Sequence, residues 1–264
     1  MSMSKSSFAP AVVATLLIAT LAAAQDDRYG EHLEPEESVF EGHGVTSEGY
    51  YSILDEYDRL LVSALVDAYG ENVVARVIVV PSFKAETAVG LREKDGTYKV
   101  FYLQPDAHLW AVHHLAAGKK ALEHPGDADE EQIAWVEENV RALEKAVPAD
   151  YREVKISKCE RDVDAELGKR IHRLWVGMLR GTRYPDVPSS GMDGWTYHFS
   201  VRSNDRFGTH TMAGQSRNPP SNSNAGRLVA VAGAMRDFCD NSGRKWLDRL
   251  EKRVEELSEH LETE

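Results

Sequence analysis

The sequence predicts an α+β fold, in which an antiparallel sheet of two hairpins plus two further strands carries helices packed mainly on one face. Two strand–turn–strand patterns, at residues 88–103 and from Gly194 to Ala213, predict the hairpins, and amphipathic helical segments separate them. These patterns occupy residues 50–264, which we expect to form a single domain or two halves that meet near Pro148.

A helix, a strand and a hairpin are predicted first. Apolar residues recur at helical spacing from Tyr51 to Tyr69, and residues 73–80 are a β-branched run typical of a buried strand. Asp95-Gly96 then separates two alternating strands, which is the strongest short-range signal of a hairpin. Helical patterns follow over residues 106–122 and 127–147.

Strands and helices continue to alternate in the second half of the chain. A strand from Tyr151 to Cys159 precedes a strongly amphipathic helix over residues 162–180. The second hairpin is expected to turn at Ser203 to Asp205. Pro219-Pro220 separates this hairpin from an apolar helix that ends at Cys239.

The last helix carries a short heptad seam. Its apolar residues recur three and four positions apart, at Leu247, Leu250, Val254, Leu257 and Leu261. A seam of about two repeats is short for an independent coiled coil. We therefore expect the helix to dock on the same chain, with a dimer contact as the alternative.

The N-terminus predicts export. Lys5 precedes an apolar run from Ala9 to Leu21, and Ala22-Ala23-Ala24 is the small-residue pattern of a signal-peptide cleavage site. The run of about 13 residues is too short to cross a bilayer, which needs about 20. We therefore expect a cleaved signal peptide at residues 1–24 and an extended lead-in at 25–49. No later segment has the composition of a membrane span, so the mature chain should be a soluble secreted protein, periplasmic if the source is a Gram-negative bacterium.

Charge and cysteine content narrow the function classes. The chain has 31 Lys plus Arg against 43 Asp plus Glu, a net charge of −12 that disfavours nucleic-acid binding. Its two cysteines, Cys159 and Cys239, are expected to form a disulfide in an oxidising compartment. The alternative is two separate buried thiols, because free cysteine packs as a small apolar residue.

The histidines of the 106–122 segment invite a test for metal binding. Two helical ligands share a face when they lie three or four residues apart. His108 and His113 are five apart, and His113 and His114 are adjacent, so no pair among them meets this condition. We expect no metal site here.

The second hairpin holds the only candidate catalytic residues. Strand alternation puts His198 and Ser200 on its polar face. A three-residue loop at Ser203 to Asp205 would place His198 opposite His210 on that face, as a base or metal ligand with its partner. The alternative is that these histidines are ordinary surface residues of a half-exposed sheet.

Known catalytic and cofactor motifs do not occur in the chain. Gly214-Gln215-Ser216-Arg217-Asn218 departs from the nucleophile-elbow pattern at its last position. The sequence has no Walker loop, no dinucleotide glycine fingerprint and no His-Glu-x-x-His. No cofactor is therefore expected.

Three segments of the chain resemble sequences in other proteins. Residues Pro81–Leu91, Tyr197–Ser200 and Arg227–Ala230 resemble sequences of uncharacterised exported proteins of Gram-negative bacteria. The resemblance implies a periplasmic setting and no particular activity. The leading hypothesis is a non-enzymatic secreted protein that binds a protein or small-molecule partner. The alternative is a hydrolase or metal-dependent enzyme that uses His198 and His210.

Overall fold

A computed structural model describes residues 30–35, 50–184, 193–205 and 208–263 of the chain. The predicted signal peptide at residues 1–24 lies outside the described residues, as does most of the predicted lead-in at 25–49. Among the described helices, none is both long and apolar enough to cross a membrane.

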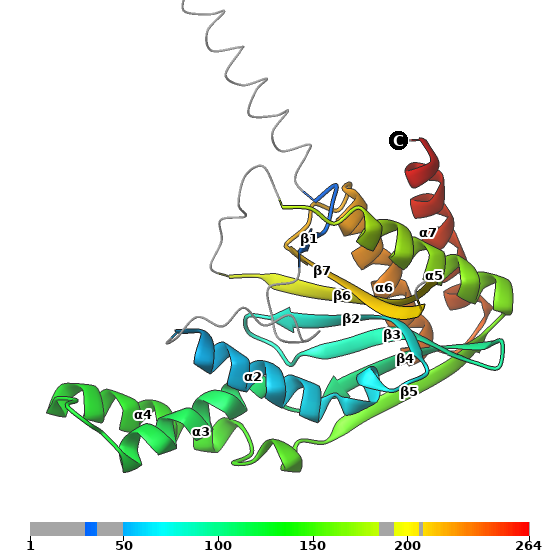
Figure 1. Ribbon diagram of the computed structural model, residues 1–264. Coiled ribbons are helices and arrows are strands. Elements are labelled where there is room, and N and C mark those ends of the chain that lie inside the picture. Colours follow the sequence, from blue (N-terminus) through cyan, green and yellow to red (C-terminus); the bar gives the residue numbers. More distant parts are fainter. Residues whose placement is uncertain (1–29, 36–49, 185–192, 206–207, 264) are drawn as a thin grey trace, which may run out of the picture.

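Seven described strands form one antiparallel sheet in the order β1-β7-β6-β2-β3-β4-β5 (Figure 1). Their bounds are β1 Glu34–Pro35, β2 Val73–Pro81, β3 Thr87–Lys94, β4 Thr97–Pro105, β5 Ile156–Val163, β6 Trp195–Asp205 and β7 Gly208–Arg217. The predicted α+β class and antiparallel pairing are confirmed. The strand absent from the prediction is β1, which lies in the lead-in and pairs with β7. The sheet joins strands from both sides of Pro148 because β6 pairs with β2.

The described residues also form six α-helices. They are α2 Tyr50–Ala64, α3 Leu109–Glu123, α4 Glu130–Ala146, α5 Ala165–Arg180, α6 Asn224–Asp240 and α7 Arg244–Thr263. Short 3-10 helices lie at Val66–Tyr69 (η2) and Tyr151–Glu153 (η3).

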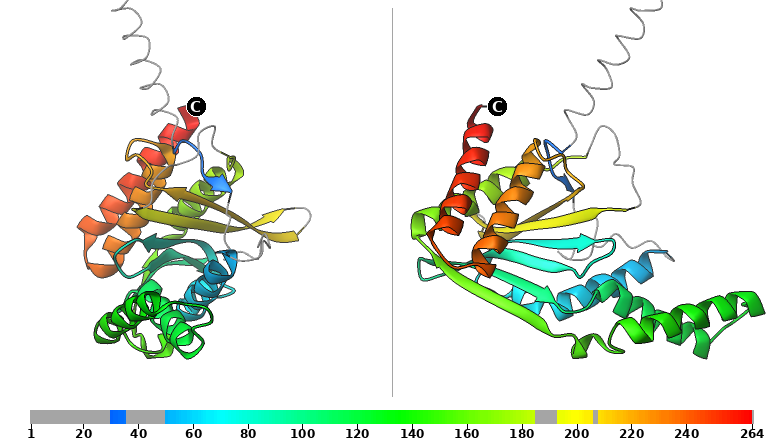
Figure 2. Two further views of the ribbon diagram at one scale, coloured as in Figure 1. Left: turned by 90° about the vertical axis from the view of Figure 1, so that its left-hand side faces the viewer. Right: turned by 180° about the vertical axis from the view of Figure 1, so that it is seen from behind.

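Helices cover both faces of the sheet, so the expectation that they pack mainly on one face was wrong (Figure 2). Strand β2 shows the reason, because it buries side chains on both sides. Ala75 and Val77 contribute to the core shared with α5, α6 and α7, whereas Ile78 contributes to the core shared with α2 and α3. A nearly continuous apolar run, in place of strict alternation, is typical of such a two-sided strand.

The two hairpins test the turn predictions in opposite ways. Asp95 and Gly96 have φ values of 52° and 79° and join β3 to β4, which confirms the first hairpin. In the second hairpin, Asp205 pairs with Gly208. The expected turn at Ser203 to Asp205 was therefore wrong, because these three residues continue β6 and pair with residues of β7.

Helix α7 docks on the same chain. Three of its seam residues, Leu250, Val254 and Leu257, are fully buried in the core that α5 and α6 share. The favoured prediction for the heptad seam is confirmed, because this chain itself covers the apolar face.

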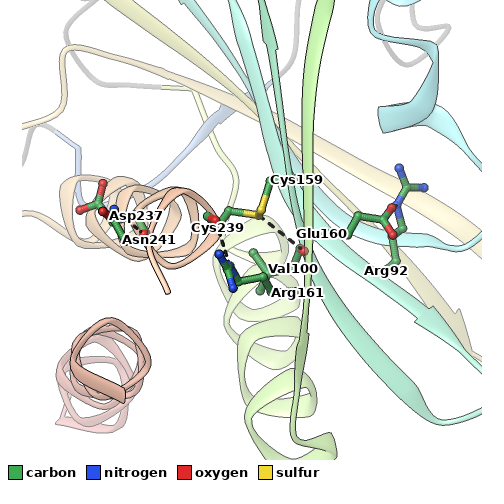
Figure 3. The surroundings of a disulfide bond; sticks show 8 residues. All are labelled: Arg92, Val100, Cys159, Glu160, Arg161, Asp237, Cys239 and Asn241. Carbon is green, nitrogen blue, oxygen red and sulfur yellow. Dashed lines mark hydrogen bonds and ion pairs between the residues drawn. A yellow bond between two sulfur atoms is a disulfide. The ribbon is translucent and has the colours of Figure 1, made fainter. Parts of the chain in front are cut away.

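The predicted cysteine pair also forms. Cys159 of β5 and Cys239 near the end of α6 lie at disulfide-bonding distance, with their Cα atoms 5.7 Å apart (Figure 3). Beside the sulfurs, Arg161 Nε donates to the backbone oxygen of Cys239 at 2.9 Å. The bond and this contact join the last strand of the sheet to the helices on one face.

Helices α3 and α4 form an antiparallel pair that extends away from the sheet (Figures 1 and 2). Helix α4 begins with a capping box, in which the side chain of Asp129 accepts from the backbone N–H of Gln132 and the Gln132 side chain accepts from that of Asp129. Only Val140 is buried among the side chains of α4, and Trp135 on its outer side is 67% exposed.

Candidate functional site

The structure does not bring the predicted histidine pair together. His198 lies opposite Gln215, and His210 lies opposite Ser203. Because successive residues of a strand point to opposite faces, His198 and His210 lie on opposite faces of the sheet. The predicted pairing was wrong because β6 continues through Asp205, beyond the expected turn, so that His198 pairs five residues further along β7 than expected.

Ser200 shares a face with His198 and is 3% exposed. It lies between Arg76 of β2 and Ala213 of β7 in the sheet. A buried hydroxyl in this position offers no route for a substrate. The structure therefore does not assemble His198, His210 and Ser200 into one site, and among the described residues no group of three His, Cys, Asp or Glu could hold a metal.

A cleft lies elsewhere, where β2 ends and β6 begins. Its volume is about 380 Å³, within the usual range for small-ligand sites. It is lined by Tyr57, Val80, Pro81, Ser82, Phe83, Trp110, Asp193, Thr196 and Arg217. We call it the aromatic cleft, because Tyr57, Phe83 and Trp110 supply three aromatic rings.

Glu86 holds two of these aromatic residues in place. Its side chain is 0% exposed, and its Oε1 accepts from the Tyr57 hydroxyl at 2.6 Å and from the Trp110 backbone N–H at 2.9 Å. Its Oε2 accepts from the backbone N–H of Leu109 at 2.7 Å. One carboxylate therefore binds the wall residue from α2 and the first turn of α3, which carries the other wall residue.

The position of Glu86 follows from the electrostatics of a helix N-terminus. The first N–H groups of a helix have no intrahelical partner and carry a partial positive charge. Helix α3 has no side-chain cap from its own N-cap residue, His108. Glu86, from the β2–β3 loop, supplies the missing acceptors, and His108 Nε2 lies 3.5 Å from its Oε1. The carboxylate satisfies the helix end and fixes the loop to the helix.

Burial keeps Tyr57 in its neutral, donating form. The pKa of Tyr57 is raised well above its ordinary value, first by burial, then by the negative charge of Glu86 and the hydrogen bond to it. The phenol therefore remains a hydrogen-bond donor at physiological pH. Its ring meets Trp110 edge to face, with centroids 4.7 Å apart and planes at 84°, a favoured aromatic geometry.

The opposite rim of the cleft is built on Gly194. Its backbone N–H donates to Ser82 Oγ at 2.9 Å, and its carbonyl accepts from the Ser82 backbone N–H at 2.9 Å. Asn218 Oδ1 accepts from the next backbone N–H, that of Trp195, at 2.8 Å. Gly194 has a φ of 142°, and a Cβ there would lie 2.0 Å from the Asn218 side chain. Only glycine fits this junction.

This rim presents aromatic surface to solvent. Phe83 at this rim is 79% exposed, and nearby Trp195, which begins β6 but does not line the cleft, is 39% exposed. Lys84 Nζ lies 5.5 Å from the centroid of the Trp195 ring, within reach of a cation–π contact. Exposed aromatic side chains beside a concave site are typical of a binding surface.

The polar groups of the cleft favour binding over nucleophilic chemistry. The Ser82 hydroxyl accepts from Gly194 N–H and donates to the Gly194 carbonyl at 3.1 Å. It is thus engaged on both sides by the backbone. The lining also contains a hydroxyl group from Thr196, a carboxyl group from Asp193 and a guanidinium group from Arg217. These groups can orient a polar edge of a ligand while the rings contact its apolar face.

Sequence reasoning missed this site. Glu86 belongs to the Pro81–Leu91 segment that carries the resemblance, but nothing in that segment predicts a buried carboxylate. A usable signal was the absence of a capping side chain at the start of α3, since an uncapped helix end needs an acceptor from elsewhere.

Comparisons with known proteins add no assignment: no protein family, no curated protein and no solved structure matches this chain.

Proposed function

We propose that this chain is a non-enzymatic binding protein that works outside the cytoplasm and holds a small amphipathic ligand in the aromatic cleft. The observation that carries the proposal is the fixed position of the cleft walls. Glu86 binds Tyr57 and the first turn of α3 at once, so the site exists before a ligand arrives. A preformed site loses little conformational entropy on binding.

The lining selects the ligand class. Rings from Tyr57, Trp110 and Phe83 favour a ligand with a flat apolar face, and Asp193 and Arg217 favour hydroxyl or carboxylate groups at its edge. A saccharide unit or an aromatic acid combines these features. The enzymatic alternative has less support, because His198 and His210 lie on opposite faces of the sheet.

Two observations support a location outside the cytoplasm. Residues 1–24 have the pattern of a signal peptide. Cys159 and Cys239 lie at bonding distance, and disulfides persist in oxidising compartments. Together they favour secretion, or the periplasm of a Gram-negative source.

Ligand binding can be followed by tryptophan fluorescence, because Trp110 lines the cleft. The purified chain would be titrated with neutral oligosaccharides, acidic oligosaccharides and aromatic carboxylic acids. We expect saturable binding of at least one class. Trp110→Leu should weaken that binding by about tenfold or more, because buried aromatic anchors dominate binding energies.

Two further variants make the test specific. Phe83→Ala removes an exposed rim side chain that the fold does not need and should weaken binding severalfold. Trp135→Leu changes an exposed tryptophan on α4 and should leave the affinity unchanged. The proposal is wrong if no compound class binds, or if Trp135→Leu reduces affinity as much as Trp110→Leu.

A further inference from the structure

A second and larger cleft lies at the opposite ends of β2 and β6. Its volume is about 710 Å³, and its lining comes from α5, the start of β2, the β3–β4 hairpin and the far end of the β6–β7 hairpin. Its charged lining residues are His172, Arg173, Arg180, Arg202, Glu71 and Glu93. We call it the arginine cleft.

Helix α5 presents its part of the lining as one face. His172, Val176 and Arg180 follow one another at intervals of four residues, and Arg173 and Gly177 lie beside them. Three guanidinium groups therefore meet in one concavity of a chain whose net charge is −12. This local reversal of charge is the first sign of an anion site, because the molecule as a whole repels anions.

The guanidinium groups retain unused donors. Arg180 is exposed, and within the described part of the chain its side chain forms no ion pair. Arg173 Nη2 contacts Glu166 at 3.1 Å in a pair that is 68% exposed on both sides, and such pairs are weak. Arg202 uses Nη1 to donate to the Glu71 backbone oxygen, which leaves the rest of its fork of donors.

The remaining polar groups hold the cleft in shape. His172 Nε2 lies 2.8 Å from the Arg202 backbone oxygen, so the imidazole donates there and ties α5 to β6. The Glu93 carboxylate accepts from the Gly96 backbone N–H at 2.8 Å in the β3–β4 turn. The first contact holds the backbone of Arg202 against α5. The second engages the Glu93 carboxylate within the β3–β4 hairpin.

Gly177 leaves room beside the arginines. It lies on the exposed face of α5, and a Cβ built on it would meet no atom within 4 Å. A larger side chain can therefore enter the cleft at this position without a clash with the fold. The position offers a way to block the cleft without a change of charge.

We propose that the arginine cleft binds an organic anion with carboxylate or phosphate groups, held by Arg180 and Arg202. The planar guanidinium fork matches both groups by paired hydrogen bonds. This inference does not depend on the aromatic cleft, which lies at the other ends of the same strands.

Calorimetric titration of the whole chain with citrate and with inorganic phosphate tests the proposal. Sodium chloride keeps the ionic strength constant, so that general screening cannot imitate binding. We expect saturable binding of at least one anion, and Arg180→Gln should weaken it by about tenfold. Binding of only one of the two anions would identify the preferred head group and would equally support the site.

Two variants separate a built site from general charge effects. Gly177→Leu keeps every charge and should abolish binding, with an unchanged or higher melting temperature because leucine is a better helix former. Arg141→Gln removes an exposed arginine of α4 that pairs with Glu137 and should leave binding unchanged. Absence of saturable binding to both anions overturns the proposal, as does an equal loss in Arg141→Gln and Arg180→Gln.

Discussion

Glu86 shows how a single buried carboxylate can position two distant aromatic side chains. Its contacts join residues that are 29 and 24 positions away along the chain. Each of its oxygens accepts from a backbone N–H of α3, and one of them also accepts from a buried phenol. Glu86 is therefore a positioning residue, because both of its carboxylate oxygens accept hydrogen bonds from groups of the protein itself.

Replacement of Glu86 by glutamine should therefore destabilise the fold and loosen the aromatic cleft together. The amide group of Gln would face an N–H donor and leave it unpaired. We expect the free energy of unfolding to fall by about 2–3 kcal/mol, the usual cost of losing hydrogen bonds to a buried charge. Denaturant unfolding would measure the loss.

The matched control for this change is Glu137→Gln. Glu137 is exposed on α4 and pairs with Arg141 at 3.1 Å, so its loss should cost less than about 0.5 kcal/mol. If Glu86→Gln proved as stable as Glu137→Gln, Glu86 could not be the residue that fixes the cleft walls.

His113 should give the chain a response to acid. Burial lowers its pKa below the ordinary 6.5, the nearby His114 lowers it further, and Glu56 acts in the opposite direction. Between the lowered folded pKa and 6.5, the unfolded chain binds more protons than the folded chain. The contribution of neutral His113 to the free energy of unfolding is therefore fully present above pH 6.5, the pKa of the unfolded state. It decreases as the pH falls toward the folded pKa.

A comparison with His113→Phe isolates this contribution. His113 Nε2 is buried and makes no hydrogen bond to the described chain, so phenylalanine should be accepted at this position at pH 7.5. The advantage of the variant over the wild type should grow as the pH falls to 5.5, measured by urea unfolding at each pH. A constant difference across this range would show that His113 does not titrate with unfolding.

At the scale of single elements, sequence patterns succeed where local chemistry determines the backbone. Asp95-Gly96 predicts the first hairpin because both residues must adopt positive φ, as they do. The second hairpin has no such constraint. Ser203, Asn204 and Asp205 are common turn residues, yet here they continue the strand. The observed register differs from the predicted one by five residues, since His198 pairs with Gln215 and not with His210. Because five is odd, the shift puts His210 on the opposite face of the sheet from His198, so the predicted histidine pair does not form.

The aromatic cleft could not be predicted from any one element. Tyr57 lies on α2, Glu86 in a loop, Trp110 on α3, and the opposite rim begins at Gly194. Their proximity depends on the order of strands in the sheet, which places β6 beside β2. Helical and strand periodicity predict which residues of an element face the core, but they do not predict which distant segment of the chain packs against them.

At the scale of the whole molecule, the disulfide secures the edge of the sheet. Among the described strands, β5 pairs only with β4, and an edge strand with one neighbour has few backbone contacts to retain it. The bond from Cys159 to Cys239 attaches β5 to α6, which packs on α7. It thus connects the sheet edge to the larger helical layer across a sequence separation of 80 residues.

Removal of this link should lower global stability and leave the clefts in place at low denaturant. We expect the double variant Cys159→Ala/Cys239→Ala to unfold with a free energy lower by about 2–4 kcal/mol, because the bond restricts the unfolded chain. Wild-type protein in a reducing agent should match the variant, and the agent should have no effect on the variant itself. If reduction left the denaturation midpoint of the wild type unchanged, the bond would contribute nothing to stability. The pairing of β5 with β4 and the remaining contacts to α6, such as that of Arg161 with the Cys239 carbonyl, would then be sufficient to hold the sheet edge.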